Sequence, residues 1–263
     1  MLQICDTAFP SGSLANSLGL ESALAHGIVT RGHPDDSLHA FVCLTLEQMA
    51  HQSLPFVRAA HAATLLRRNA DVSDSPTVRA CLCEVDHVCS VVTLNEVARR
   101  SSLNQGKCFL RACSAAFAHR PYSGIIDMIA ATVSLGKMHG HYPVVFGAMC
   151  GLLGISVCMA ERMMLRCALR DLASCAARLN VIGPLEGASL QARLGEFVVE
   201  ALLNSSPSRW CTPPSPGSLN LELLSHEAIL QRLLTDDAPR VTAPVLELVQ
   251  GRHDLLYARL FNS

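Results

Sequence analysis

Ala168–Leu194 reads ALRDLASCAARLNVIGPLEGASLQARL, and this stretch indicates the fold class most clearly. Apolar residues recur at helical spacing through its first half and just before it, namely Leu165, Ala168, Leu169, Leu172, Cys175, Ala176 and Leu179. Asn180 and Gly183 both tolerate the left-handed backbone conformation that ends many helices. Pro184 suits the first turn of a following helix because proline has no backbone N–H. The stretch therefore predicts two helices joined by a sharp turn.

The rest of the chain repeats this alternation of helix and break. The helices on either side of the turn are predicted over residues 162–180 and 185–203, and others over 14–26, 37–68, 78–98, 99–119, 124–138, 142–160, 219–234 and 244–260. Pro55 lies inside one of these segments and is expected to kink or split it. No run of alternating apolar and polar residues predicts a strand. The sequence predicts an all-α, bundle-like fold of roughly ten helices in a single domain, residues 1–263.

The composition supports a sizeable core and excludes several classes of protein. Hydrophobic residues make up 50% of the 263 residues and charged residues only 16%, which is too apolar for a disordered chain. The formal net charge is −1, so the charge balance indicates neither a nucleic-acid partner nor an acidic membrane. Aromatic residues are sparse at 5%, and the abundance of Leu and Ala favours helices over a β-sandwich.

The 12 cysteines are interpreted as reduced thiols of a cytoplasmic protein. No secretory signal precedes them, their spacing is irregular, and several fall at apolar helix positions. Cys81, Cys83, His87 and Cys89 are close in sequence but do not share one face of a helix. Four ligands so placed cannot surround one metal ion without unwinding that helix, so we predict no metal site there.

The segment Tyr142–Ala160 carries no formal charge and is long enough to raise the question of a membrane span. Pro143, three glycines and Ser156 dilute its hydrophobicity, and the chain has no second segment of this kind. Gly147 and Gly151 lie four residues apart, which lets a neighbouring helix approach closely. We interpret the segment as a buried central helix. A membrane-associated helical protein is the alternative.

Motifs for nucleotide binding and catalysis are absent from the sequence. The Gly-Lys pairs at 106–107 and 136–137 lack the other residues of a P-loop. Ser11-Gly12-Ser13 has no nucleophile-elbow frame around it. His139 and His141 are candidates for transient metal contact, because neutral imidazole binds nickel well, and capping or buried histidines are the alternative. We predict no enzyme and no catalytic residue, with a small helical hydrolase of scattered residues as the alternative.

A polar stripe is predicted along the helical region around residue 100. Asn95, Arg99, Ser102 and Gly106 are spaced by four, three and four residues, so they share one helix face. Glycine costs a helix roughly 1 kcal/mol relative to alanine, so its use at position 106 indicates the close approach of another backbone. We predict that this stripe binds a partner protein. An ordinary solvated face is the alternative.

Five blocks of the chain resemble the UreF family of urease accessory proteins. One block is Ala168–Leu194, the stretch quoted above. The others are Cys5–Val29 (CDTAFPSGSLANSLGLESALAHGIV), Asn95–Lys107 (NEVARRSSLNQGK), Gly140–Ile155 (GHYPVVFGAMCGLLGI) and Val249–Ser263 (VQGRHDLLYARLFNS). Their order and spacing carry the resemblance, which covers most of the chain. The chain departs from the family at Gly12-Ser13-Leu14, where a Gly-Gly pair and an aromatic residue are common. Residues 205–239 look like an insertion, with a Pro/Ser-rich loop at 205–218.

The resemblance implies an all-α accessory protein without enzymatic activity. Such a protein would bind the accessory protein UreD, also called UreH, and this pair would recruit the GTPase UreG to apo-urease. GTP-dependent nickel insertion would follow, so nickel and GTP would be handled by the partner proteins and no cofactor would be bound stably by this chain. The family forms homodimers, so a homodimer is expected. No nucleic acid and no membrane is expected as a partner.

The tail, residues 249–263, is predicted to bind a partner. Tyr257, Arg259 and Phe261 place two aromatic rings and an arginine in a region where chains are normally polar and frayed. Such side chains commonly anchor protein interfaces. The resemblance adds that the family engages its partner through its C-terminal region. Docking of the tail onto the protein's own core is the alternative.

Overall fold

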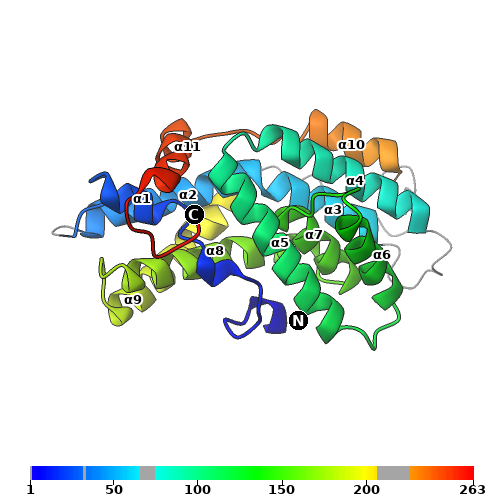
Figure 1. Ribbon diagram of the computed structural model, residues 1–263, viewed down its shortest axis with the longest axis horizontal. Helices are drawn as coiled ribbons and strands as arrows, with labels where there is room; N and C mark the ends of the chain where they lie inside the picture. Colours follow the sequence, from blue (N-terminus) through cyan, green and yellow to red (C-terminus); the bar gives the residue numbers. More distant parts are fainter. Residues whose placement is uncertain (1, 32–33, 66–74, 206–224) are drawn as a thin grey trace.

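The computed structural model describes residues 2–31, 34–65, 75–205 and 225–263, and these residues include helices but no strand. The α-helices are α1 (Leu20–Ala25), α2 (Pro34–Gln52), α3 (Leu54–Leu65), α4 (Ser75–Val92), α5 (Glu96–Ala116), α6 (Ser123–Ser134), α7 (Tyr142–Leu152), α8 (Val157–Arg178), α9 (Pro184–Ser205), α10 (His226–Leu234) and α11 (Pro244–Gly251). Short 3-10 helices within the described ranges are η1 (Leu2–Cys5), η2 (Ser13–Ala15) and η5 (Arg252–Leu255). The predicted all-α fold is confirmed. Figure 1 shows α10 and α11 along the upper side and α9 along the lower side.

Helix α7 is buried along its length in the middle of the fold. Every residue from Pro143 to Leu152 is buried, and the helix packs most extensively against α3. The crossing is close because Gly147 and Gly151 face α3: a Cβ atom on Gly147 would lie 2.3 Å from the carbonyl oxygen of Val57. A Cβ atom on Gly151 would lie 2.2 Å from the hydroxyl oxygen of Thr64. The interpretation as a buried central helix is confirmed for residues 142–152.

The sequence predicts one helix as far as Ala160, but the apolar segment does not continue as one helix. It ends at Leu152 and turns at Gly154, whose φ of +69° favours glycine. Ser156 then caps α8, because its hydroxyl accepts a hydrogen bond from the Met159 N–H at 3.4 Å. Across the described part of the chain, none of the helices combines the length and the hydrophobicity that a bilayer crossing requires.

Helices α8 and α9 form the predicted hairpin. Asn180 takes the left-handed conformation with φ 54°, whereas Gly183 does not, and Pro184 begins α9 as expected. Two arginines of α8 reach across to α9: Arg162 donates to both carboxylate oxygens of Glu200, at 2.9 and 2.8 Å, and Arg166 donates to the Gly195 carbonyl oxygen. Polar contacts between α8 and α9 therefore add to the apolar packing of the hairpin.

Two long predicted helical regions are interrupted. Pro55 splits the first as expected, since α2 ends at Gln52 and α3 begins at Leu54. Residues 66–68 of that prediction lie outside the described residues. The second region, predicted to run on through residue 98 with little interruption, breaks at Thr93–Asn95. There the Asn95 side chain accepts hydrogen bonds from the Val97 and Ala98 N–H groups, at 3.0 and 3.2 Å, and caps α5.

The helix predicted over residues 14–26 is interrupted between η2 and α1. Leu18 and Gly19 both have positive φ, at 52° and 85°, so α1 begins only at Leu20. Gly12, the first residue of the turn in which the chain departs from the family pattern, has a structural role. Gly12 has φ 75°, and a Cβ atom there would lie 3.1 Å from the Cβ of Cys108. The turn therefore packs tightly on α5.

The described end of the predicted insertion, residues 225–239, packs on the core. Helix α10 lies against α3 and α4. Arg58 of α3 donates Nη1 to both carboxylate oxygens of Asp237, at 2.7 and 2.9 Å, and donates Nε to Glu161 of α8. From residue 206 onward, the predicted Pro/Ser-rich loop at 205–218 lies outside the described residues.

The cysteines that the structure describes carry free thiols except at one position. Cys158 is disulfide-bonded, so the interpretation of reduced thiols throughout is wrong there. Cys81, Cys113 and Cys175 are buried, and burial raises the pKa of each thiol to about 12. Over residues 2–31, 34–65, 75–205 and 225–263, no group of three or more His, Cys, Asp or Glu side chains is placed to hold a metal ion.

Candidate partner-binding surface

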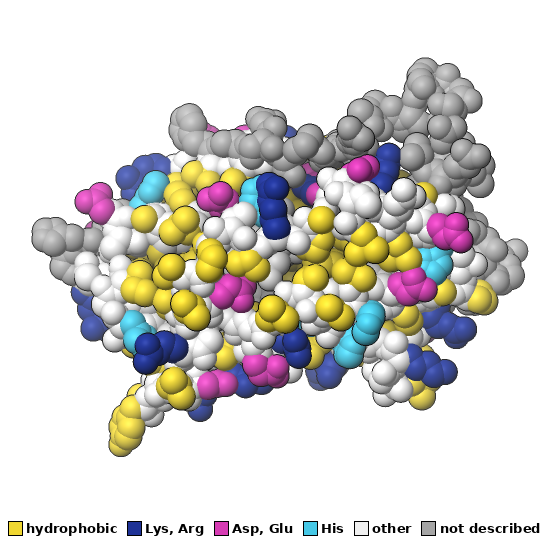
Figure 2. All heavy atoms as spheres, turned by 90° about the horizontal axis from the view of Figure 1, so that it is seen from above, with side chains coloured by type: hydrophobic (Ala, Val, Ile, Leu, Met, Phe, Trp, Pro, Cys, Tyr) yellow, Lys and Arg dark blue, Asp and Glu magenta, His cyan; other side chains and the backbone are white. Residues whose placement is uncertain are grey.

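Helix α11 carries apolar side chains on two sides, and only one side meets the core. Val249 is buried beneath the helix, while Val245 and Leu248, three residues apart, are 62% and 70% exposed. Leu255 in η5 and Leu94 in the link before α5 are also exposed, at 76% and 81%. Figure 2 looks down on this side of the molecule and shows hydrophobic side chains gathered across its middle. We call Leu94, Val245, Leu248 and Leu255 the α11 face.

The first two residues of the predicted polar stripe position this face. Besides capping α5, Asn95 donates its amide to the carbonyl oxygen of Glu247 at 2.9 Å, which holds α11 against the start of α5. Arg99 donates Nε and Nη2 to the Thr93 carbonyl oxygen at 3.1 and 2.7 Å. These bonds fix the α4–α5 link and hence the direction of Leu94.

The last two residues of the stripe face the interior of the same chain. The Ser102 hydroxyl accepts the Tyr142 N–H at 3.1 Å and lies 3.2 Å from Nδ1 of His141. A Cβ atom on Gly106 would lie 2.0 Å from the carbonyl oxygen of Gly140, so the close backbone approach expected at this glycine is present within the chain. A direct partner contact stays a prediction for the stripe, and Arg99, whose side chain is 32% exposed, is the member best placed for one.

A buried carboxylate organises the segment that contains the two candidate metal-contact histidines. Asp86 of α4 is fully buried and accepts backbone N–H bonds from His139, Gly140 and His141, at 2.6, 3.2 and 2.8 Å. Its negative charge lies at the N-terminus of α7, where the helix dipole favours an anion. No sequence signal pointed to Asp86, because an aspartate within an amphipathic helix normally faces solvent.

His139 is exposed and His141 is fully buried, with ring centroids 6.1 Å apart. His141 matches the buried-histidine alternative, and its Nε2 has no hydrogen-bond partner in the structure. Burial, with smaller effects from His139 and Arg99, holds the pKa of His141 below its usual value despite the nearby Asp86. The ring is therefore neutral at pH 7. Transient nickel contact at these two histidines stays a prediction.

Stability should fall on mild acidification because two histidines are buried in neutral form. Burial lowers the folded-state pKa of His61 as well as that of His141 below the ordinary 6.5. Below pH 6.5 the unfolded chain therefore takes up protons that the folded chain resists, and stability is lost as pH falls. Each group contributes a slope of at most about 1.4 kcal/mol per pH unit. Between pH 7.5 and 5.5, urea denaturation should show a smaller loss of unfolding free energy for His141→Asn than for the wild type. His139→Asn should lose as much as the wild type.

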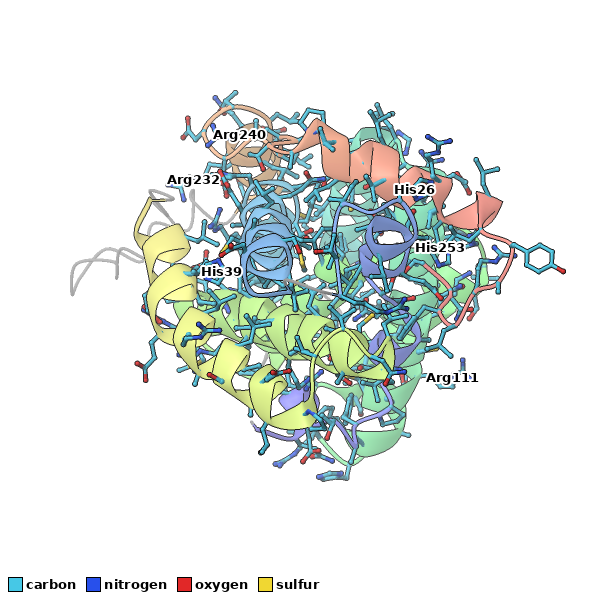
Figure 3. The ribbon with its side chains drawn as sticks, turned by 90° about the vertical axis from the view of Figure 1, so that its left-hand side faces the viewer. His26, His39, Arg111, Arg232, Arg240 and His253 are labelled. Atoms are coloured by element: carbon cyan, nitrogen blue, oxygen red, sulfur yellow. The ribbon has the colours of Figure 1, made fainter. Side chains whose placement is uncertain are left out.

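The sequence predicts a helix as far as Leu260, but the tail instead becomes a non-helical segment that is docked on the protein. Helix α11 ends at Gly251 and η5 ends at Leu255. Glu21 of α1, which is 8% exposed, accepts hydrogen bonds from Nε2 of His253 at 2.9 Å and from the Leu260 and Phe261 N–H groups at 2.5 and 3.1 Å. Figure 3 shows His253 where α11 passes into this segment. One carboxylate therefore holds the tail at three points.

The three predicted tail residues have different environments. Tyr257 is fully exposed. Arg259 is paired with Asp254 at 3.0 Å and keeps 46% of its side chain exposed. Phe261 is 5% exposed and lies under the Arg178 guanidinium, 4.5 Å from the ring centroid. Phe261 therefore follows the docking alternative, while partner binding by the exposed Tyr257 and Arg259 stays a prediction.

Replacing Glu21 by glutamine should loosen the tail while keeping the fold. The substitution removes the charge and one of the acceptor oxygens, and hydrogen bonds to a charged group contribute about 1.5–3 kcal/mol each. Hydrogen exchange of the Leu260 and Phe261 amides should accelerate by about 10-fold to 100-fold. Mass spectrometry of the peptide that spans residues 256–263 measures this. Glu196→Gln, at an exposed position of α9, is the control, and equal exchange in both variants would contradict the role of Glu21.

A cavity of about 140 Å³ lies beneath α11. Ser102, Tyr142 and Glu247 are among its lining residues, together with several glutamines. Burial raises the pKa of the Glu247 carboxyl, as the hydrolase alternative would require of an acid in a pocket. His141 does not line the cavity, however, and its ring nitrogen Nε2 has no orienting carboxylate. Ser102 and His141 are in contact, but no carboxylate orients the His141 ring, so the arrangement is not a triad and gives the hydrolase alternative little support.

Sequence reasoning missed the exposed side of α11. The signal was present in Pro244–Gly251, PVLELVQG, because a helix apolar on two sides needs a second contact beyond the core. The fold and this surface define the class: an all-helical protein with an exposed apolar face suited to contact another protein.

Comparison with known proteins is consistent with this class. The family model UreF matches residues 33–195, more than half of the chain. Urease accessory protein F of Arabidopsis thaliana is 28% identical over 99% of this chain and 90% of its own length. A UreF-like urease accessory protein of Schizosaccharomyces pombe is 30% identical over 100% of this chain and 95% of its own length. Urease accessory protein UreF of Paenarthrobacter aurescens is 26% identical over 99% of this chain and 96% of its own length. The chain belongs to the UreF family of urease accessory proteins.

Proposed function

We propose that the chain is a scaffold for urease maturation that binds the accessory protein UreD (UreH) and, with it, recruits the GTPase UreG to apo-urease. Membership of the UreF family supports a role in maturation together with other accessory proteins. The α11 face is the observation that carries the proposal of a direct contact. Four apolar side chains there are between 62% and 81% exposed, and Asn95 and Arg99 bind the backbone of α11 and of the α4–α5 link, which carry three of them.

The α11 face has the make-up of an interface core with a polar rim. Its centre is aliphatic, and Tyr257, Arg259 and Arg100 lie at the edge where the tail leaves α11. Tyrosine and arginine are enriched among residues that dominate binding energy. Burying Leu248 and Val245 against a partner would remove apolar area from water at about 25 cal/mol per Å². UreD is the occupant that the family resemblance implies.

In this proposal the chain acts through binding energy. GTP would be bound and hydrolysed by UreG, nickel would be delivered by the assembly, and this chain would bind neither as a stable cofactor. A scaffold that binds one nucleotide state of UreG more tightly shifts the GTPase toward that state by the difference in binding free energy. We further propose a homodimer and a cytoplasmic location for the complex.

Co-purification tests the proposal. The chain is co-expressed with the UreD homologue and UreG of its own organism, and the complex is isolated with and without a non-hydrolysable GTP analogue and nickel. We expect a complex with UreD under all conditions and UreG in it when the analogue is present. A folded chain that captures neither protein would contradict the scaffold role. Deleting residues 249–263 is a poor control, because it removes the buried His253 and Phe261.

Leu248→Asp should abolish most binding to UreD without affecting the fold. The side chain is 70% exposed, so its substitution leaves the core of this chain intact, but it places a charge in the centre of the proposed interface. Loss of a central interface residue costs about 2 kcal/mol or more, which is about 30-fold or more in Kd. Titration calorimetry measures the change. Leu185→Asp, at an 87% exposed position of α9, should bind normally, and equal binding by both variants would place the interface elsewhere.

A further inference from the structure

The cavity beneath α11 lies between several helices that are far apart in the sequence. Its lining includes Gln48 of α2, Gln105 of α5, Tyr142 of α7 and Glu247 of α11. Its volume of about 140 Å³ is about ten times the space that one water molecule needs. The cavity is therefore large enough for an organic molecule of a few non-hydrogen atoms.

Among the described residues, Glu247 is the only charged side chain that lines this cavity. Its carboxylate is half-buried, accepts a hydrogen bond from Nε2 of Gln48 at 2.7 Å and makes no ion pair with any described residue. The orientation of the Gln48 amide is fixed, because its Oε1 accepts the Ala243 N–H at 3.1 Å. Removing a charge from water without a partner of opposite sign is costly. A carboxylate in this position is therefore suited to a positively charged ligand.

Two other polar side chains of the cavity have unused hydrogen-bonding groups. The Gln105 amide and the Tyr142 hydroxyl make no hydrogen bond with any described residue. Both side chains also line an adjoining cavity of about 30 Å³, so they lie where the two spaces meet. An amide oxygen and a phenolic oxygen can each accept a hydrogen bond from a donor on a ligand.

The remaining wall of the cavity is largely apolar. It includes Leu18, Met49, Phe56 and Met164. Methionine side chains adapt to the shape of an apolar ligand, and the face of an aromatic ring attracts a cation. An inorganic ion would leave this wall in contact with water, and the described residues place no group of three or more His, Cys, Asp or Glu around a metal ion. The charge and the apolar wall together favour an organic cation.

We propose that this cavity binds a small organic cation, with a primary ammonium group at Glu247 and an aliphatic chain along Met49 and Phe56. A primary ammonium has three N–H donors, and its hydrogen bonds to a carboxylate are stronger than those between neutral groups. The bound ligand would link α11 to α2 and α5. The site does not depend on the scaffold role, because Glu247 lines the cavity whereas the adjacent Leu248 is exposed.

Titration of the full-length, isotope-labelled chain with n-butylammonium tests this proposal. Nuclear magnetic resonance follows the side-chain amide signals of Gln48 and Gln105, and n-butanol and butyrate serve as neutral and negatively charged ligands of similar size. We expect n-butylammonium to shift both signals and to bind at least about 10-fold more tightly than n-butanol, because it adds a hydrogen bond between charged groups. Butyrate should not bind. Equal binding of n-butylammonium and n-butanol, or unchanged glutamine signals, would overturn the proposal.

A charge-removing substitution tests the role assigned to Glu247. Glu247→Gln should weaken n-butylammonium binding by about 10-fold or more and leave n-butanol binding unchanged, because the shape of the side chain is kept. Glu196→Gln, at an exposed position of α9, is the matched control and should bind as the wild type does. The comparison of ligands in the wild-type chain applies even where Glu247→Gln fails to fold. Potassium chloride that shifts the same signals as strongly as n-butylammonium would indicate an inorganic cation site and overturn the proposal.

Discussion

Gly147→Ala is expected to remove about 3 kcal/mol or more of the free energy of unfolding. The new methyl carbon would lie 2.3 Å from the carbonyl oxygen and 2.8 Å from the Cα of Val57, and both atoms belong to the backbone of α3. A flexible side chain could move aside, but here α3 and α7 must separate, and overpacking of this kind commonly costs 1–3 kcal/mol or more. A domain is normally stable by only about 5–15 kcal/mol. Urea denaturation followed by circular dichroism measures the loss.

The matched control is the same substitution in a helix that has room for it. A Cβ atom on Gly195 of α9 would have its nearest neighbour, Cδ2 of Leu169, at 3.9 Å, an ordinary contact distance. Gly195→Ala should therefore leave stability unchanged or raise it by up to about 1 kcal/mol, because alanine favours a helix. If Gly147→Ala were as stable as Gly195→Ala, α3 and α7 would not cross as closely as the structure shows.

Arg58→Met is expected to cost about 3–5 kcal/mol of stability at neutral pH. Arg58 is 1% exposed and binds Glu161, itself 3% exposed, as well as Asp237. Its removal leaves the Glu161 carboxylate buried without its cation, which costs far more than a surface ion pair. The same substitution at Arg162, whose ion pair with Glu200 lies at the surface, should change stability little. Thermal and urea denaturation of the two variants compare these effects.

The loss in Arg58→Met should shrink as the pH falls. Burial already raises the pKa of Glu161, and Arg58 is the main opposing influence. Without Arg58 the folded-state pKa rises further above the unfolded value of 4.5, so the folded chain binds the proton more tightly. The stability deficit of the variant relative to the wild type is then smallest below pH 4.5 and grows as pH rises through the folded pKa of Glu161. A loss that does not depend on pH would contradict a buried carboxylate as its cause.

The fold could be predicted from the sequence where local signals and burial agree. Asn180 and Pro184 mark the hairpin between α8 and α9 because both the apolar spacing and the turn chemistry point to it. Gly147 and Gly151, four residues apart, also predicted the close helix packing that α7 shows against α3. The break at Thr93–Asn95 was missed, although an Asn cap followed by Glu96 is a usual helix start, because the apolar spacing continues across it.

The binding surface was harder to predict because exposure is a tertiary property. Three residues of the polar stripe lie on α5 and Asn95 caps it, yet Ser102 and Gly106 meet the start of α7, some 40 residues away along the chain. Glu21 lies in an ordinary helical context, and only the folded chain brings Leu260 and Phe261 to its carboxylate. Leu248 could be recognised as exposed only once Val249 was known to occupy the core side of α11.

Reconstitution of urease maturation tests the central claim most directly. The apo-urease, UreD homologue and UreG of the same organism are expressed together with nickel, either with this chain, without it, or with Leu248→Asp or Leu185→Asp. Urease activity and the nickel content of purified urease are then measured. We predict nickel-loaded, active urease with the wild-type chain and Leu185→Asp, and strongly reduced loading without the chain or with Leu248→Asp. Equal nickel content with and without the chain would contradict its role in urease maturation.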